Sequence, residues 1–206
     1  MKRDIPYVNL IKQIKEEKKE IFETIQKVII SGQFVLGGEV DKFEKNICKL
    51  LNIKNCIALN SGTDALTLGL NILGVGRNDE VITPPNSFFA STAAIVHLGA
   101  IPVFVDVKKD QNIDPQDIEK KINKKTKAIM PVHLSGHACE MDKIIKISKK
   151  YKIPIIEDAA QAIGTKYRNK FVGTYGELGC FSAHPLKNLN AIGDAGYLVT
   201  NNNRLA

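Results

Sequence analysis

Residues 80–105 read EVITPPNSFFASTAAIVHLGAIPVFV and carry no Asp, Glu, Lys or Arg after their first position. Two apolar runs, at 80–83 and 101–105, enclose a turn and a helical stretch at 89–98. By its length alone such a segment could span a bilayer. Its prolines and polar residues instead predict a strand, a turn, a helix and a second strand inside a protein core, and we expect no membrane insertion.

The same alternation of short apolar runs and helical stretches continues on both sides of this segment. The runs predict strands at 56–59, 128–132 and 153–156, and further apolar pieces follow at 178–182 and 195–200. Helices are expected at 64–73, 115–122 and 141–150, after two amphipathic helices at 11–30 and near 39–51. Strands that are apolar throughout are typical of a sheet covered on both sides. The sequence therefore predicts an α/β fold with a mostly parallel sheet and helices on both faces.

The order of these elements predicts two parts. Residues 1–37 are expected to form an N-terminal helix and an interface loop, and residues 38–206 a larger domain. The chain stops after NNNRLA without a closing helix, so we expect it to be the front portion of a larger fold.

Composition excludes several classes of protein. The net charge is +7, but only four of the 29 basic residues are Arg and the Lys residues are scattered among acids. Surfaces that read nucleic acid favour Arg, so we expect no nucleic-acid partner. The four Cys show no CxxC spacing and the N-terminus lacks the apolar run of a signal peptide. We therefore expect a reducing, cytoplasmic location.

Three features at predicted strand ends could carry chemistry, because ligands of open α/β sheets bind beyond the carboxyl ends of the strands. Residues 60–65, NSGTDA, could hold a phosphate on free helix amides, or could simply cap the helix through Ser61 or Thr63. The pair Glu157-Asp158 could cap a helix, bind a metal or face a cationic ligand group. Residues 178–193 contain no Asp, Glu, Lys or Arg other than Lys187. Such isolation from other charges favours the uncharged amine that a Schiff base needs. The alternative is a lysine on a surface loop.

A phosphate cradle, an acid and an isolated lysine together are what a protein contributes to a pyridoxal-phosphate site. The sequence resembles the DegT/DnrJ/EryC1/StrS family of pyridoxal-phosphate-dependent sugar aminotransferases of fold type I. The resemblance covers residues 5–200 and rests on five motifs in order: SGTDAL at 61–66, DEVITP at 79–84, KAIMPVH at 127–133, IEDAAQA at 156–162 and FSAHPLKN at 181–188. It implies that this chain is the large cofactor-binding domain, without the C-terminal small domain.

The resemblance also implies a role for individual residues. Lys187 matches the catalytic lysine that forms a Schiff base with pyridoxal 5'-phosphate, and Asp158 matches the acid on the ring nitrogen. Further matches are Gly62, Thr63 and Ser182 at the phosphate, Phe88 stacked on the ring and Gln161 near the ring hydroxyl. The chain departs from the family at Ala183, where Phe is common, and at 193–196, where GDAG replaces Gly-Glu-Gly-Gly.

Two other groups of residues are further candidates for a role. His133, His137 and Cys139 resemble a metal cluster by composition, but the glycine and serine between them and the family resemblance argue for a loop, so we expect no metal. The glycine-rich loop at 32–38 resembles an interface segment. Family members are homodimers with shared active sites, which implies that this loop reaches the partner's pocket.

The function implied is an aminotransferase that moves an amino group, from glutamate, to a nucleotide-linked keto-deoxysugar in polysaccharide biosynthesis. One alternative is a sugar dehydratase of the same family, in which His replaces the lysine. The presence of Lys187 favours the transaminase. The other alternative is a non-catalytic fragment.

Overall fold

The computed structural model describes residue 6 and residues 8–206, and the chain divides into two compact units, residues 1–43 and 44–206. The α-helices are α1 (Leu10–Ser31), α2 (Gly38–Leu51), α3 (Gly62–Ile72), α4 (Phe89–His97), α5 (Pro115–Lys121) and α6 (Met141–Tyr151). The strands are β1 (Asn55–Leu59), β2 (Glu80–Thr83), β3 (Ile101–Phe104), β4 (Thr126–Ile129), β5 (Ile156–Asp158), β6 (Lys166–Tyr167), β7 (Lys170–Phe171), β8 (Leu178–Ser182) and β9 (Gly196–Thr200). A short 3₁₀ helix lies at Leu134–Gly136.

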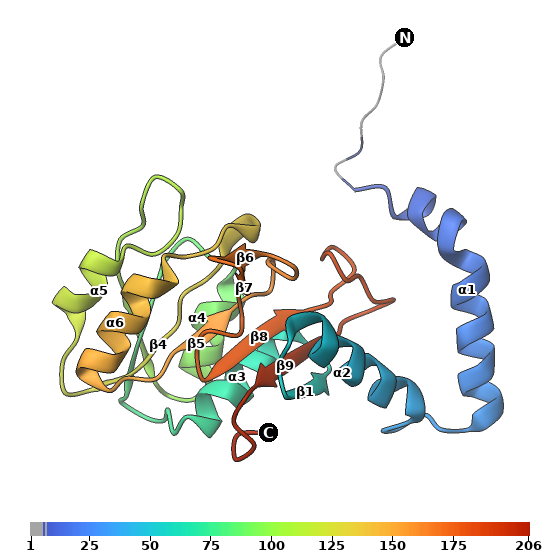
Figure 1. Ribbon diagram of the computed structural model, residues 1–206, viewed down its shortest axis with the longest axis horizontal. Coiled ribbons are helices and arrows are strands. Elements are labelled where there is room, and N and C mark those ends of the chain that lie inside the picture. Colours follow the sequence, from blue (N-terminus) through green and yellow to red (C-terminus); the bar gives the residue numbers. More distant parts are fainter. Residues whose placement is uncertain (1–5, 7) are drawn as a thin grey trace, which may run out of the picture. The chain divides into compact units, whose positions relative to one another are not determined.

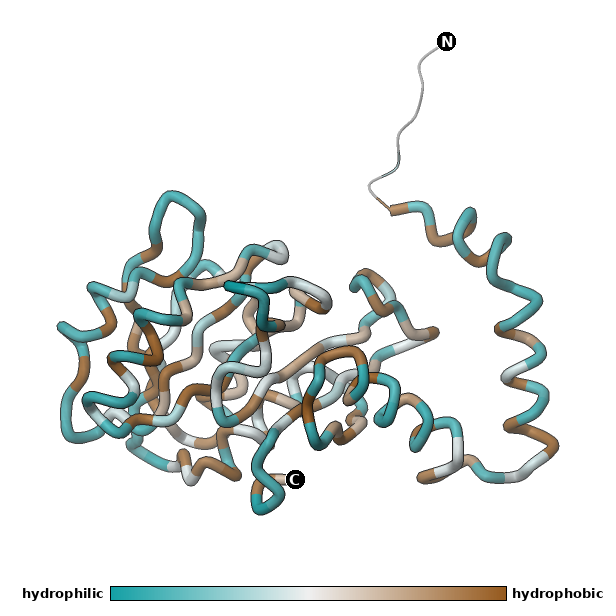
Figure 2. The backbone as a smooth tube through the Cα atoms, viewed as in Figure 1, coloured by the Kyte–Doolittle hydropathy of each residue, from teal (hydrophilic) through white to brown (hydrophobic). Residues whose placement is uncertain are grey.

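The first unit is dominated by α1, which confirms the amphipathic helix expected at 11–30. The Asn9 side chain accepts a hydrogen bond from the Lys12 amide at 3.0 Å, and Gly32 ends the helix in the left-handed region at φ 66°. Capping by Asn and a C-terminal Gly in this conformation are the usual signals of helix ends. No residue of α1 is buried, and apolar residues recur along it between hydrophilic ones (Figure 2).

The second unit is built on a mixed sheet (Figure 1). Strands β3, β2 and β4 are hydrogen-bonded neighbours, as are β5, β8, β9 and β1 in that order. Two isolated parallel bridges, Ile129 with Ile155 and Val132 with Asp158, join the two groups between β4 and β5. The pairing is parallel from β3 through β8, and β9 runs antiparallel to both β8 and β1. The prediction of a mostly parallel sheet is confirmed.

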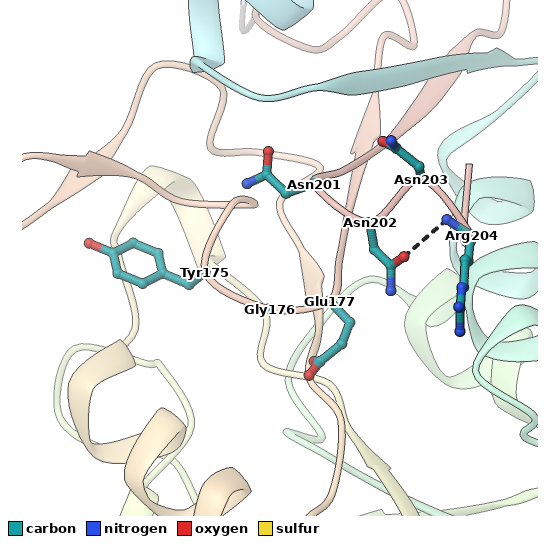
Figure 3. Close-up of a pocket in the computed structure, with 7 residues that line it drawn as sticks. All are labelled: Tyr175, Gly176, Glu177, Asn201, Asn202, Asn203 and Arg204. Atoms are coloured by element: carbon teal, nitrogen blue, oxygen red, sulfur yellow. Dashed lines mark hydrogen bonds between the residues drawn. The ribbon is translucent and has the colours of Figure 1, made fainter.

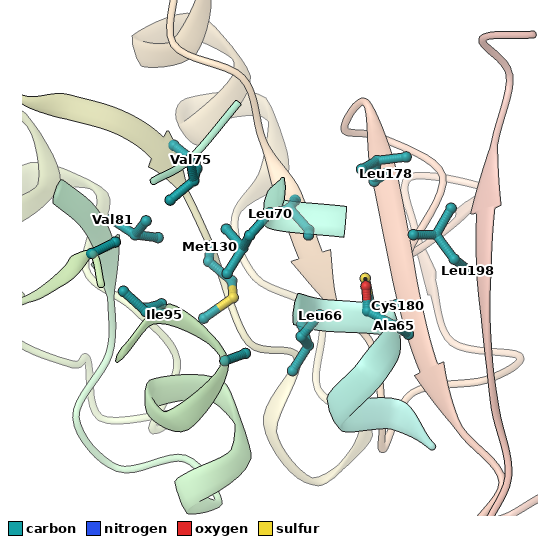
Figure 4. Packing of buried hydrophobic residues seen from close by; sticks show 14 residues of the cluster. Ala65, Leu66, Leu70, Val75, Val81, Ile95, Met130, Leu178, Cys180 and Leu198 are labelled. Atoms are coloured by element: carbon teal, nitrogen blue, oxygen red, sulfur yellow. Dashed lines mark hydrogen bonds between the residues drawn. The ribbon is translucent and has the colours of Figure 1, made fainter. Parts of the chain in front are cut away.

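Helices cover both faces of this sheet, because consecutive strand residues point to opposite sides. Val81 and Ile156 belong to a buried cluster with Leu66 of α3 and Ile95 of α4 (Figure 4). Ile82, the next residue of β2, and Ile155, the residue just before β5, belong to a second cluster with residues of α5 and α6, including Ile118, Met141 and Ile144. This double burial explains why the strands are apolar throughout.

Two expected strands are displaced in the structure. The run at 128–132 gives a strand that ends at Ile129, and the run at 153–156 gives one that begins at Ile156. Pro131 and Pro154 have no N–H to donate, so β4 and β5 are joined by single bridges rather than a full ladder. The hydrogen bond from the Asp158 amide to the Pro131 carbonyl, 2.9 Å, places Asp158 inside β5 instead of after it. Among the described residues, no helix is both long and apolar enough to cross a membrane.

Candidate active site

One edge of the sheet gathers three of the sequence-predicted features. Gly196, the first residue of β9, is paired with Leu59 at the end of β1 and with Ser182 at the end of β8. Asp158 ends β5, beside Cys180 of β8. The segments that follow β1, β5 and β8 therefore leave the sheet at the same edge, which is where ligands of such sheets bind.

The turn from β1 into α3 is packed tightly against β8 and β9. Only glycine fits at Gly62 in the turn and at Gly196 in β9. A Cβ atom at Gly62 would lie 2.8 Å from the Cβ of Ser182, and one at Gly196 would lie 2.3 Å from the Ser61 carbonyl carbon. These close approaches bring the backbone at the start of α3 against Ser182. The predicted phosphate residues Gly62, Thr63 and Ser182 are thus brought together.

Ser61 caps α3, which begins at Gly62, two residues before the expected start. The Ser61 Oγ accepts a hydrogen bond from the Asp64 amide at 3.0 Å. The amides of Gly62 and Thr63 lie in the first turn, where a helix offers its N–H groups no internal acceptor. Cap and cradle were alternatives in the sequence. In the structure Ser61 makes the cap, and the two following amides point from a helix N-terminus, which favours an anion.

Asp158 is a buried carboxylate, with 4% of its surface exposed. Its Oδ2 accepts a hydrogen bond from the Ser91 hydroxyl at 2.7 Å, and its Oδ1 accepts one from the Ala160 amide at 3.2 Å. Burial raises the pKa of Asp158, while these two hydrogen bonds and the charge of Lys187 act to lower it, as a protonated His133 would. A buried carboxylate of this kind is suited to face a cationic group of a ligand.

Lys187 lies on the loop between β8 and β9, partly buried. Ala183 closes this loop at its base, since its amide donates to the Ala195 carbonyl and its carbonyl accepts from the Ala191 amide, both at 2.8 Å. The Lys187 amide donates to the His184 carbonyl at 2.8 Å, which forms a turn around the lysine. The positive charge of Lys187 acts to lower the pKa of Asp158, and its effect is smaller than those of burial and of the two hydrogen bonds.

Two predicted cofactor residues have side chains whose positions are now defined. Phe88 precedes α4 and is 62% exposed, with its ring 4.4 Å from that of Phe89, centre to centre. The Gln161 side-chain oxygen accepts a hydrogen bond from the Ser135 amide at 2.6 Å, which fixes the orientation of the amide group. Stacking by Phe88 and a ring-hydroxyl contact from Gln161 stay predictions.

Glu157, which the sequence did not distinguish from Asp158, has a structural role, because backbone amides enclose its carboxylate. It is fully buried, and its Oε1 accepts hydrogen bonds from the amides of Tyr175 and Gly176 at 2.6 and 2.7 Å. Its Oε2 accepts from the Gly173 amide at 2.7 Å and contacts His133 Nε2 at 2.9 Å. Adjacent residues of a strand point to opposite faces, so the two acids serve different sides of the sheet.

His133 uses both ring nitrogens within the protein. The Cys139 amide donates to its Nδ1 at 3.1 Å, which leaves the hydrogen on Nε2, facing Glu157. Within the part of the chain that the structure describes, no three His, Cys, Asp or Glu residues are grouped as metal ligands would be.

A pocket of about 600 Å³ lies at a different place. It is lined by Tyr175, Gly176, Glu177, Asn201, Asn202, Asn203 and Arg204 (Figure 3). These residues precede β8 and follow β9, so the pocket opens at the opposite edge of the sheet from Ser182 and Gly196. None of the sequence-predicted site residues lines it.

The residues at the carboxyl ends of β1, β5 and β8 fit pyridoxal phosphate. A glycine cradle at a helix N-terminus suits its phosphate, a buried carboxylate suits its ring nitrogen, and a lysine suits its aldehyde. The fold is that of the fold type I aminotransferases, to whose solved structures the chain is similar. The chain belongs to the DegT/DnrJ/EryC1/StrS aminotransferase family, whose model matches residues 15–206. The resemblance seen in the five motifs is confirmed.

Individual relatives agree with this assignment. The chain is 45% identical to a dTDP-3-amino-3,6-dideoxy-alpha-D-galactopyranose transaminase of Aneurinibacillus thermoaerophilus, over 98% of this chain and 56% of the relative. It is 43% identical to a pleiotropic regulatory protein of Geobacillus stearothermophilus, over 98% of this chain and 55% of the relative. The crystal structure of NtdA from Bacillus subtilis, with bound cofactor PMP, matches with a TM-score of 0.92 and 37% identity, over 99% of this chain and 47% of NtdA. The chain therefore spans about half the length of the relatives it matches.

Proposed function

We propose that the full protein is a pyridoxal-phosphate-dependent aminotransferase that moves an amino group from glutamate to a nucleotide-linked keto-deoxysugar. The observation that supports this most is geometric: the buried Asp158 ends β5 and the Lys187 loop follows β8 at the same sheet edge as the close approach of Gly62 to Ser182. The relative from Aneurinibacillus thermoaerophilus is named as a transaminase of a dTDP-linked amino sugar, which supports the substrate class. Lys187 itself favours a transaminase over a dehydratase, in which the resemblance implies His at this position.

The residues at this sheet edge have different roles in the proposed mechanism. When bound, pyridoxal phosphate supplies an electron sink for a carbanion next to the amino group. The amides of Gly62 and Thr63 and the hydroxyl of Ser182 would hold its phosphate. The carboxylate of Asp158 would keep the ring nitrogen protonated by accepting a hydrogen bond from its N–H group. The Lys187 amine would hold the cofactor by its aldehyde group, with loss of water, and, once the amine of the amino donor has displaced it, would accept and return a proton as the base.

The direct test of this function uses the full-length protein. It would be incubated with pyridoxal phosphate, glutamate and a panel of nucleotide-linked keto sugars, and the products would be identified by mass spectrometry. We expect an amino sugar together with 2-oxoglutarate. A panel that yields no amine with any donor would overturn the proposal.

Asp158→Asn is expected to keep the fold and to slow the half-reaction with glutamate by about 10²–10³-fold. Removing a preorganised group that stabilises charge in the transition state slows a reaction by roughly this factor. Single-turnover kinetics of the cofactor-loaded full protein would measure it. The exposed Asp41→Asn is the matched control and should react at the wild-type rate. A rate for Asp158→Asn within a few-fold of wild type would reduce Asp158 to a structural acid.

We further propose a cytoplasmic homodimer with shared active sites, in which the loop at 32–38 reaches the partner's pocket. Exposed apolar side chains support an interface on the first unit. On α1, Phe22, Ile25 and Ile29 are 67%, 43% and 60% exposed, and Phe34 of the loop is 68% exposed. Apolar surface of this kind marks protein interfaces.

Phe22→Glu combined with Ile29→Glu is expected to convert the full-length dimer into a monomer, because the change places two charges in the proposed apolar contact. Light scattering after gel filtration would measure the mass. Lys27→Glu, an exposed position on the opposite face of the same helix, is the control and should leave the dimer intact. A monomeric wild-type protein would contradict the proposed dimer.

A further inference from the structure

Two serines of the segment that enters α4 form a chain of hydroxyl groups that ends on Asp158. Ser87 lies before α4 and is partly exposed, while Ser91 lies in its first turn and is 1% exposed. Their Oγ atoms are 2.8 Å apart, and the Ser91 Oγ lies 2.7 Å from Asp158 Oδ2. Ser91 and Asp158 are 67 residues apart in sequence, so this contact exists only because α4 packs over the end of β5.

The direction of the chain follows from the number of hydrogens. An ionised carboxylate only accepts, so Ser91 must use its single hydroxyl hydrogen on Asp158. The Ser91 oxygen is then an acceptor, and Ser87 must donate to it. Hydroxyls aligned in this way strengthen one another. Were Asp158 neutral, its own hydrogen could point at Ser91 and the chain would reverse.

Few other groups act on this carboxylate. The Ala160 amide donates to its other oxygen, and the charge of Lys187 on the β8–β9 loop favours its ionised form, as a protonated His133 after β4 would. Cys180 of β8 is also close, but burial and the nearby acids raise the pKa of its thiol, which stays neutral and donates to the Ala65 carbonyl at 3.2 Å. Against these stands the burial of Asp158, which raises its pKa and is the largest effect on it. Ser91 supplies the one side-chain hydrogen bond to Asp158 among the described residues.

We infer that Ser91, oriented by Ser87, is a positioning residue that holds Asp158 ionised in its buried place. That Asp158 then faces a cofactor ring nitrogen rests on the proposed function. Ser91 itself touches neither the reacting atoms nor the lysine in this assignment.

The experiment titrates Asp158 in the apo full-length protein by carbon-13 NMR of labelled Asp side chains, with Asp158→Asn used to assign the signal. Ser91→Ala should move the midpoint upward by about one pH unit, because a hydrogen bond to a charged acceptor contributes roughly a ten-fold factor to its ionisation. Ser87→Ala should give a smaller upward shift. Ser91→Thr keeps the hydroxyl and should restore the wild-type midpoint, while Thr92→Ala, at the neighbouring position, should leave the midpoint unchanged.

The affinity for pyridoxal phosphate gives a second readout. Ser91→Ala should weaken it by up to about ten-fold at a pH below the midpoints of both proteins, where the variant's Asp158 is less ionised, and the loss should fade as the pH rises past them. An unshifted midpoint in Ser91→Ala overturns the inference whatever the enzyme's activity. A shifted midpoint in a protein that binds no pyridoxal phosphate supports the role of Ser91 and contradicts the proposed function instead.

Discussion

Lys187→Ala should lose covalent attachment of pyridoxal phosphate and reduce amino transfer in the full-length protein by about 10²–10⁴-fold or more. Proton transfer by a positioned side chain alone has this value, and the variant also loses the nucleophilic amine. Borohydride reduction followed by peptide mapping should mark Lys187 in the wild-type protein and no lysine in the variant. The structure adds a reason to expect a specific effect, since Lys187 is partly buried on a loop closed at its base.

Two further variants separate the chemistry of Lys187 from its charge. Lys187→Arg keeps a positive charge near Asp158 but offers no reactive amine, so it should be as inactive as the alanine variant. Lys166→Ala removes an exposed lysine from β6 and should behave as wild type. Covalent labelling at another lysine, or an active Lys187→Arg protein, would show that the catalytic amine has been assigned to the wrong residue.

Glu157→Ala should lower the free energy of unfolding by about 3–5 kcal/mol, the usual cost of removing one partner of a buried ionic or strongly hydrogen-bonded group. The change leaves the amides of Gly173, Tyr175 and Gly176 without their acceptor and removes the partner of His133. Urea unfolding of the full-length protein would measure the loss.

Glu157→Gln refines this test. Its amide oxygen can still accept from two backbone N–H groups, but its NH₂ group cannot accept from the Gly173 amide, so the loss should be intermediate. Glu39→Ala removes an exposed ion pair with Lys42 and should cost less than about 1 kcal/mol. A Glu157→Ala protein as stable as that control would show that the buried contacts contribute little.

Much of the fold could be predicted because its signals are local. Apolar runs and amphipathic stretches lie in a single window of sequence, and double burial makes the strands apolar throughout. The least accurate bounds were those of β4 and β5, where Pro131 and Pro154 interrupt the ladder without changing the apolar pattern.

The site was predicted less evenly. Gly62, Asp158 and Lys187 follow or end strands in recognisable motifs, so their meeting at one edge could be expected. Ser91 was missed because a lone serine in an apolar helix gives no pattern, and its partner is distant in sequence. The different parts played by Glu157 and Asp158 could not be read either, since only the positions of the loop at 173–176 and of α4 decide which acid is enclosed by backbone amides.

The order of the strands has a consequence for synthesis of the protein. Among the described residues β1 pairs with β9 alone, so the earliest strand to leave the ribosome finds its partner last. At about 5–20 residues per second, the interval is on the order of ten seconds. Closing so long a loop carries an entropic cost, and contacts of this range slow folding. Because the turn after β1 carries Gly62, we expect the nascent chain to complete the proposed phosphate site only when translation has passed Thr200.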